Sequence, residues 1–420
     1  MSSTGSSLWR HSDFLKLWTG ESISLIGSQI TFLALPLTAV TVLNATPFEM
    51  GVLGAVEFAP FLLLSLVAGV WADRLPRRPI LITANLGRAI LLATIPVLAF
   101  NDSLTMNALY GIAFGVGVLT VFFDVAYQSY LPVLVTREQL VEGNSKLEGS
   151  RSVAEIAGPA MAGGLVQAFT APIAIAVDAV SFLISAFFLG LIRQKEEARH
   201  SSEKWKPIWG EIREGLDVVF RNPILRSIAG CTATNNFFSN VRFAVLTIYV
   251  VRELGIEPGV LGIIFAVGSV GALIGALWGS AIARRWGIGP TLIGAIAIGS
   301  LGSLALPAAQ GPFAFAVAML TLGLFFNSAA NPVYNITQIS LRQSIVPLRL
   351  QGRMNASMRF LVWGTIPLGS LIGGALGEVI GIHSTLLIGA IGGLLTVLWV
   401  FFSPVRSLMQ TPTLEDEPTV

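Results

Sequence analysis

The amino-acid sequence predicts an all-α polytopic membrane protein, with twelve transmembrane helices arranged as two six-helix pseudo-repeats. Charged residues make up only 12% of the 420 residues, about half the share of an average soluble domain. Hydrophobic residues make up 53%, and the mean hydropathy is +0.73. The charges gather in a few clusters between long apolar runs, as they do in helical membrane proteins. Several segments of the first half also return, in order, in the second half.

Apolar runs of about 20 residues, long enough to cross a bilayer, recur along the whole chain. Prolines near the starts of several runs mark helix beginnings, where a missing backbone N–H costs nothing. The expected spans are residues 18–42, 50–71, 79–99, 105–130, 147–168, 171–192, 224–249, 258–282, 289–309, 312–337, 356–378 and 383–403.

The longest polar stretch divides the chain near its middle. We expect a six-helix bundle at 1–192, a linker at 193–222, a second bundle at 223–405 and a tail at 406–420. The second half of the linker has apolar residues at helical spacing, which predicts an amphipathic helix along the membrane interface. A plain tether between the two bundles is fully compatible with this helix and is the favoured function of the linker.

The basic residues predict the orientation of the chain. Connections after even-numbered spans carry many Lys and Arg residues, whereas Arg252 is the one basic residue expected on the opposite side. By the positive-inside rule, both termini and the linker are expected to be cytoplasmic.

Four pairs of segments match between the two halves at nearly one offset. Glu49-Met-Gly-Val-Leu-Gly54 returns 208 residues later, and Gly69-Val-Trp-Ala-Asp-Arg74 returns 210 residues later. Phe122-Phe-Asp124 returns 203 residues later as Phe-Phe-Asn, and Arg151 and Pro159 return 208 residues later. Two parallel repeats are the plan of a rocking transporter, with a substrate site near mid-membrane.

The loop after the second span carries a motif. It reads Gly69-Val-Trp-Ala-Asp73-Arg74-Leu-Pro76-Arg77-Arg78 and resembles the signature loop of the major facilitator superfamily, Gly-x-x-x-Asp-Arg-x-Gly-Arg-Arg. Pro76 stands where the family usually has Gly, and proline fixes a turn by another route. The resemblance covers nearly the whole chain and implies a secondary transporter.

Span five carries a second motif, Gly158-Pro159-Ala-Met-Ala-Gly163-Gly164. It is similar to the Gly-Pro segment that antiporters of this superfamily have in the same span. The stretches 140–164 and 178–182 look like the branch that holds macrolide exporters and the enterobactin exporter. Close helix packing explains the same small residues without any role in coupling.

We expect the signature loop to act as a cytoplasmic latch. A carboxylate at Asp73 can accept hydrogen bonds from the N-terminal amides of a neighbouring helix, and arginines can bridge to acidic groups. In relatives the position of Asp124 pairs with the loop arginines, so the resemblance adds it to the latch. The alternative is that the arginines are topological anchors. The latch residues are Gly69, Asp73, Arg74, Arg77, Arg78 and Asp124.

Carboxylates inside the spans are costly and are therefore candidates for proton coupling. The candidates all lie in the first half, and each also has a structural interpretation, such as a local ion pair or a helix cap. Glu57 is the first choice because its own helix offers no charged neighbour; it needs either a proton or a cation such as Arg88 or Arg242. Glu155 is the second choice, although Arg151 on the same helix face is a possible ion-pair partner. Asp178 and Glu21 complete the set.

Spans one, four, seven and ten, which usually line the cavity in this superfamily, offer amide and aromatic side chains. Such a wall suits a bulky amphipathic ligand, and hydrogen bonds between helices explain single amides equally well. With two buried arginines added, the cavity candidates are Gln29, Arg88, Tyr127, Gln128, Asn235, Asn236, Arg242, Asn327, Asn331 and Asn335.

The sequence therefore predicts an exporter of a drug-like molecule, natural product or siderophore, driven by proton antiport in a bacterial inner or plasma membrane. A proton-coupled importer is the alternative, followed by a non-transporting scaffold or receptor. We expect a monomer in the lipid bilayer, with no cofactor, no metal site and no nucleic-acid partner. An enzyme is not expected, because no nucleophile–base pair or cofactor loop appears.

Overall fold

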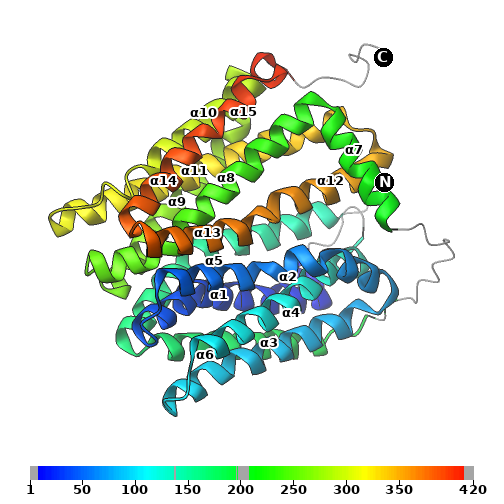
Figure 1. The fold of residues 1–420 in the computed structure, drawn as a ribbon. Coiled ribbons are helices and arrows are strands. Elements are labelled where there is room, and N and C mark those ends of the chain that lie inside the picture. Colours follow the sequence, from blue (N-terminus) through cyan, green and yellow to red (C-terminus); the bar gives the residue numbers. More distant parts are fainter. Residues whose placement is uncertain (1–7, 137–138, 195, 197–207, 411–420) are drawn as a thin grey trace. The chain divides into compact units, whose positions relative to one another are not determined.

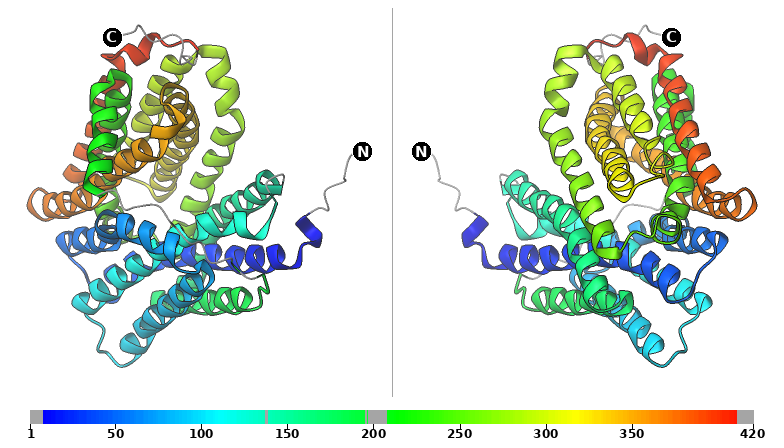
Figure 2. Two further views of the ribbon diagram at one scale, coloured as in Figure 1. Left: turned by 90° about the vertical axis from the view of Figure 1, so that its right-hand side faces the viewer. Right: turned by 90° about the vertical axis from the view of Figure 1, so that its left-hand side faces the viewer.

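The chain is described from a computed structural model that covers residues 8–136, 139–194, 196 and 208–410, except for the side chains of residues 65–74, 208–209, 211–212 and 348–349. Figures 1 and 2 show that this part of the chain is helical, and it contains no β-strand. The side chains of Gly69, Asp73 and Arg74, residues 195 and 197–207 of the predicted linker and the end of the predicted tail lie outside the described residues. The predictions for them therefore remain predictions.

The chain divides into two compact units that do not follow the two halves of the sequence strictly. Unit 1 comprises residues 1–45, 56–202 and 256–266, and unit 2 comprises residues 46–55, 203–255 and 267–420. The first residues of the second helix thus belong to unit 2, and the first residues of the ninth helix belong to unit 1.

Unit 1 is built around its first helix, α1, which packs against α4, α5 and α6. Helix α3 packs against α4 and α6. The helices of this unit are α1 (Ser12–Thr41), most of α2 (Pro47–Arg74), α3 (Arg77–Phe100), α4 (Met106–Leu134), α5 (Leu140–Ala168) and α6 (Ala171–Gly190), preceded by the short η1 (Leu8–Arg10).

Unit 2 repeats this plan around α8, which packs against α12, α13 and α14. Helix α10 packs against α11 and α14, as α3 packs against α4 and α6 in unit 1. The helices are α7 (Ile208–Arg221), α8 (Pro223–Ile248), η3 (Tyr249–Glu253), most of α9 (Pro258–Trp286), α10 (Ile288–Ser303), α11 (Phe313–Ile345), α12 (Leu348–Trp363), α13 (Thr365–Val379), α14 (Ile382–Leu395), α15 (Val397–Phe401) and η4 (Pro404–Ser407).

The all-helical membrane fold predicted from the sequence is confirmed. Within the described residues, nine helical segments are long and apolar enough to cross a membrane, and α10 is a shorter apolar helix. Helix α5 begins at Leu140, before the apolar run predicted at 147–168, because its first turns are helical but polar. The predicted span 356–378 is divided between α12 and α13, which meet at Gly364.

Candidate functional site

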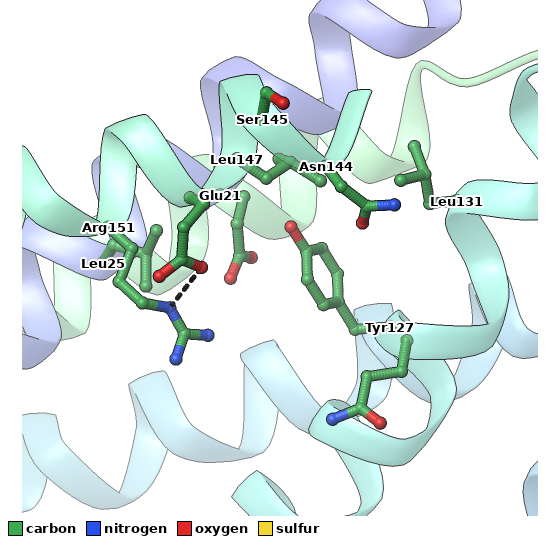
Figure 3. Close-up of a pocket in the computed structure, with 10 residues that line it drawn as sticks. Glu21, Leu25, Tyr127, Leu131, Asn144, Ser145, Leu147 and Arg151 are labelled. Atoms are coloured by element: carbon green, nitrogen blue, oxygen red, sulfur yellow. Dashed lines mark ion pairs between the residues drawn. The ribbon is translucent and has the colours of Figure 1, made fainter. Parts of the chain in front are cut away.

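Unit 1 contains a cavity of about 500 Å³ between α1, α4 and α5 (Figure 3). Helical spacing explains its wall, since residues three or four apart lie on one helix face. Glu21 and Leu25 lie one turn apart on α1, and Glu148 and Arg151 lie three residues apart on α5. The cavity is lined by Glu21, Leu25, Tyr127, Gln128, Leu131, Asn144, Ser145, Leu147, Glu148 and Arg151.

The structure therefore brings three of the candidates named from the sequence, Glu21, Tyr127 and Gln128, to one cavity. It adds Asn144, which precedes the span predicted at 147–168, and Glu148, which lies in the first turn of that span; sequence reasoning named neither as a cavity residue. The signal that could have found them is the polar face of that first segment, where Asn144, Glu148 and Arg151 recur at helical spacing.

The exposed charges of this cavity form an ion pair. The Nε atom of Arg151 lies 3.8 Å from an oxygen of Glu148, and both side chains are more than half exposed (Figure 3). The sequence offered Glu155 as the partner of Arg151; in the described part of the chain, the ion pair of Arg151 is with Glu148. Exposed pairs of this kind are weak, so both charges are free to exchange this contact for one with a ligand.

The buried charges of unit 1 centre on Arg88, which is 4% exposed. Its guanidinium carbon lies 4.2 Å from the ring centre of Phe123 and 4.1 Å from that of Phe182. Arg88 donates to the Asn85 side chain, which in turn donates to the Ser185 hydroxyl over 2.9 Å. The arginine is thus held by stacking as well as by hydrogen bonds.

Three carboxylates act on Arg88 electrostatically: Asp124 most strongly, then Glu21 and Asp178. Glu21 is 7% exposed and also lines the cavity. Buried Asp178 accepts hydrogen bonds from the Thr31 hydroxyl over 2.5 Å and the Ser181 hydroxyl over 2.9 Å. Helices α1, α3, α4 and α6 thus place two buried acids, Glu21 and Asp178, and the half-buried Asp124 around one buried base.

Glu57 and Glu155 are not part of this group. Within unit 1, no charged side chain of the described residues acts on Glu57, so Arg88, one of its two expected partners, does not act on it. Glu155 is half-buried on α5. The structure therefore separates the four coupling candidates: Glu21 and Asp178 join Arg88, and Glu57 and Glu155 do not.

The Gly-Pro segment of α5 lies at two close helix contacts. Gly158 packs against the Gln29 side chain of α1, where a Cβ atom would collide. A Cβ atom on Gly163 would lie 2.9 Å from the Cα atom of Gly262 in α9. A Cβ atom on Gly164, in contrast, would meet no atom of the described residues within 4 Å. Buried Pro159 lies between these contacts, inside α5.

The last residues of the signature loop, Arg77 and Arg78, are hydrogen-bonded to an acidic residue that the sequence analysis did not identify. The carboxylate of Glu196 accepts the backbone N–H groups of Arg77 and Arg78 over 2.8 and 2.7 Å. The Arg78 side chain donates to the carbonyl oxygens of Leu189, over 2.9 Å, and Gly190. No periodic pattern predicts this contact, because Glu196 lies 118 residues from Arg78.

Unit 2 contains a smaller cavity of about 160 Å³ between α8, α10 and α11. Four predicted cavity residues, Asn235, Asn236, Asn327 and Asn331, line it. Asn335 lies one turn beyond and donates to Asn331 over 2.7 Å. The wall is completed by Ser239, Ala295, Ile296, Gly299, Ser300, Ala330 and Tyr334, so it is polar but carries no ionised side chain. Among the described residues of the chain, no group of three His, Cys, Asp or Glu could hold a metal ion.

Comparisons with known proteins agree with this architecture. The chain is 27% identical over 395 residues to the multidrug efflux pump Tap of Mycolicibacterium fortuitum, covering 91% of this chain and 93% of that protein. It is 23% identical over 400 residues to macrolide efflux protein A of Streptococcus pyogenes, covering 94% and 97%.

Solved structures show the same fold. The crystal structure of the nucleoside transporter NupG matches with a TM-score of 0.68 at 14% identity, over 93% of this chain and 98% of that one. The family model of the Major Facilitator Superfamily matches residues 17–364. The chain is therefore a multi-pass membrane transporter rather than an enzyme, and it belongs to the Major Facilitator Superfamily.

Proposed function

We propose that this secondary transporter exports an amphipathic small molecule, such as a drug-like molecule, a natural product or a siderophore, by proton antiport. The observation that carries the proposal is the cavity of unit 1, which places a buried carboxylate, Glu21, beside the aromatic ring of Tyr127. A mixed wall of this kind suits a ligand with apolar and polar parts. The similarity to two efflux proteins supports export.

Glu21 replaces Glu57 as our first choice for the proton carrier. It lines the cavity and also acts on Arg88. Asp124 acts on the same arginine. A proton on Glu21 therefore leaves Asp124 as the counter-charge of Arg88, so the buried group can accept and release a proton without leaving the arginine unpaired.

Transport into inside-out vesicles, with a panel of amphipathic compounds and an imposed pH gradient, tests both parts of the proposal. We expect uptake that depends on the gradient in the native protein. Glu21→Gln should retain compound binding and lose gradient-driven uptake, whereas Glu148→Gln, in the same cavity, should remain coupled. A Glu21→Gln protein that still couples uptake to the gradient would remove Glu21 from this role.

Proton-coupled import remains the second candidate function, and the same vesicles distinguish it. Import predicts gradient-driven accumulation in right-side-out vesicles rather than in inside-out vesicles. A non-transporting scaffold or receptor predicts neither and has no use for a group of buried charges.

We further propose that both termini and the segment 193–222 face the cytoplasm, because the basic residues outside the spans gather there. The test replaces Cys231, the one cysteine of the chain, with Ser, and His200 with Cys. An impermeant thiol reagent should label this protein in opened membranes but not in intact cells. Labelling in intact cells would reverse the orientation.

A further inference from the structure

Arg242 of α8 is a buried cation without a counter-charge among the described residues of its own unit. Its side chain is 6% exposed. The ion pairs described within unit 2, Arg221–Asp217 and Arg353–Glu214, involve other arginines. Arg88, a buried arginine of unit 1, has three carboxylates acting on it.

One of the hydrogen-bond partners of Arg242 lines the cavity of unit 2. One terminal nitrogen donates to the carbonyl oxygen of Gly389 in α14 over 3.0 Å, and the other donates to the Ser239 hydroxyl over 3.1 Å. Ser239 lines the cavity. Gly393 lies close both to Arg242 and to the cavity residue Ser300: a Cβ atom on Gly393 would be 3.3 Å from an Arg242 nitrogen and 3.5 Å from the Ser300 hydroxyl.

A buried charge that has only neutral hydrogen-bond partners is expensive, because a carbonyl and a hydroxyl replace a small part of its lost hydration. The adjoining cavity is lined by the Ser239 hydroxyl and the amides of Asn235 and Asn331, and by no acid. Its other polar groups already donate hydrogen bonds: Ser300 to Gly393, Asn236 to Val362 and Asn327 to Ser303. Neutral donors beside a fixed guanidinium are the groups that bind a carboxylate or a halide.

We propose that the cavity of unit 2 is a binding subsite for a small monovalent anion, either the carboxylate of an organic ligand or a free halide, with Arg242 as its counter-charge. The volume of about 160 Å³ limits the subsite to a small group. The proposal does not depend on the direction of transport or on proton coupling, because it concerns binding to the protein at rest.

A purely structural role for Arg242 makes a different prediction. In that case the arginine ties α8 to α14 through Gly389, and the protein should be indifferent to anions. The sequence also offered Glu57 as a counter-charge for Arg242. That pairing predicts no anion response in the native protein and a new response in Glu57→Gln.

The test is thermal unfolding of the purified protein in HEPES neutralised with N-methylglucamine, without added salt. Benzoate, benzamide and chloride are titrated separately. We expect benzoate to raise the midpoint temperature saturably, by about 2 °C or more, whereas neutral benzamide should leave it unchanged. A chloride response without a benzoate response would assign the subsite to a free halide, and a benzoate response would assign it to an organic carboxylate.

Two variants of the subsite and one control complete the experiment. Arg242→Gln keeps a donor for Gly389 but loses the charge, so anion binding should weaken by about tenfold or more. Ser239→Asp builds a carboxylate beside Arg242; it should raise the midpoint temperature in the salt-free buffer and remove the anion response. Arg359→Gln removes an exposed arginine that lies over Trp363 and should respond like the native protein.

Ser239→Asp keeps the proposal testable if Arg242→Gln does not fold. An absence of response to both benzoate and chloride in the native protein would overturn the proposal. Equal responses in the native protein and Ser239→Asp would also overturn it, as would a response that appears in Glu57→Gln alone.

Discussion

The Oε1 atom of Glu196 lies 2.7 Å from the backbone nitrogen of Arg78, and this carboxylate caps the first turn of α3. Pro76 precedes the helix and offers no side-chain cap, so the acid that satisfies these N–H groups comes from the segment after α6. Its negative charge also lies at the positive end of the helix dipole.

Glu196→Ala should therefore destabilise unit 1 by about 1–2 kcal/mol, the usual cost of losing a helix cap. Thermal unfolding in detergent measures the effect. Asp217→Asn is the control, because it removes an exposed ion pair with Arg221 on α7 and should change stability by about 0.5 kcal/mol or less. Equal effects of the two variants would contradict the capping role.

Gly163→Ala and Gly262→Ala should disrupt the contact of α5 with α9. A Cβ atom on Gly163 would lie 2.5 Å from the Pro258 carbonyl oxygen, and such overpacking costs about 1–3 kcal/mol. At Gly164, where the space is open, alanine should be neutral or stabilising by up to about 1 kcal/mol, because alanine favours a helix. Thermal unfolding ranks the three; a Gly164→Ala protein as unstable as Gly163→Ala would disprove the steric explanation.

Arg88→Gln should be among the most destabilising single changes in unit 1, by about 3–5 kcal/mol, because it leaves buried carboxylates without their cation. Adding Asp124→Asn to Arg88→Gln should recover part of this loss, since Asp124 acts on Arg88 most strongly. A double-mutant cycle of unfolding free energies measures the coupling. Strictly additive effects would show that the two charges do not interact.

Asp73→Asn should abolish transport while leaving insertion and thermal stability nearly unchanged, because we propose that Asp73 makes a contact that exists in one transport state. Vesicle uptake and thermal unfolding are measured together. Ala283→Asp, at the matching position of the second half, should have a smaller effect on transport. Normal uptake by Asp73→Asn would show that the latch is not required.

The helices could be predicted from the sequence because each apolar run carries its own signal. The start of α5 could not, since residues 140–146 are helical without being apolar. The acids near Arg88 were individually visible, but the choice among Asp124, Glu21 and Glu57 as partners depends on how α3 packs against α4 and α6 and how α1 packs against α6. The capping role of Glu196 could not be predicted for a related reason. A cap that comes from a distant segment produces no periodic pattern in the sequence.

The interleaved units have a consequence for how the protein is made. Gly51 of α2 belongs to unit 2, where a Cβ atom on it would lie 2.7 Å from the Cα atom of Gly374 in α13. The backbone N–H of Phe48 donates to Glu378, 330 residues later in the chain, over 3.4 Å. The beginning of α2 therefore leaves the ribosome long before its partners are synthesised. During synthesis, the first half of the chain is therefore inserted with the beginning of α2 incompletely packed until α13 has entered the membrane.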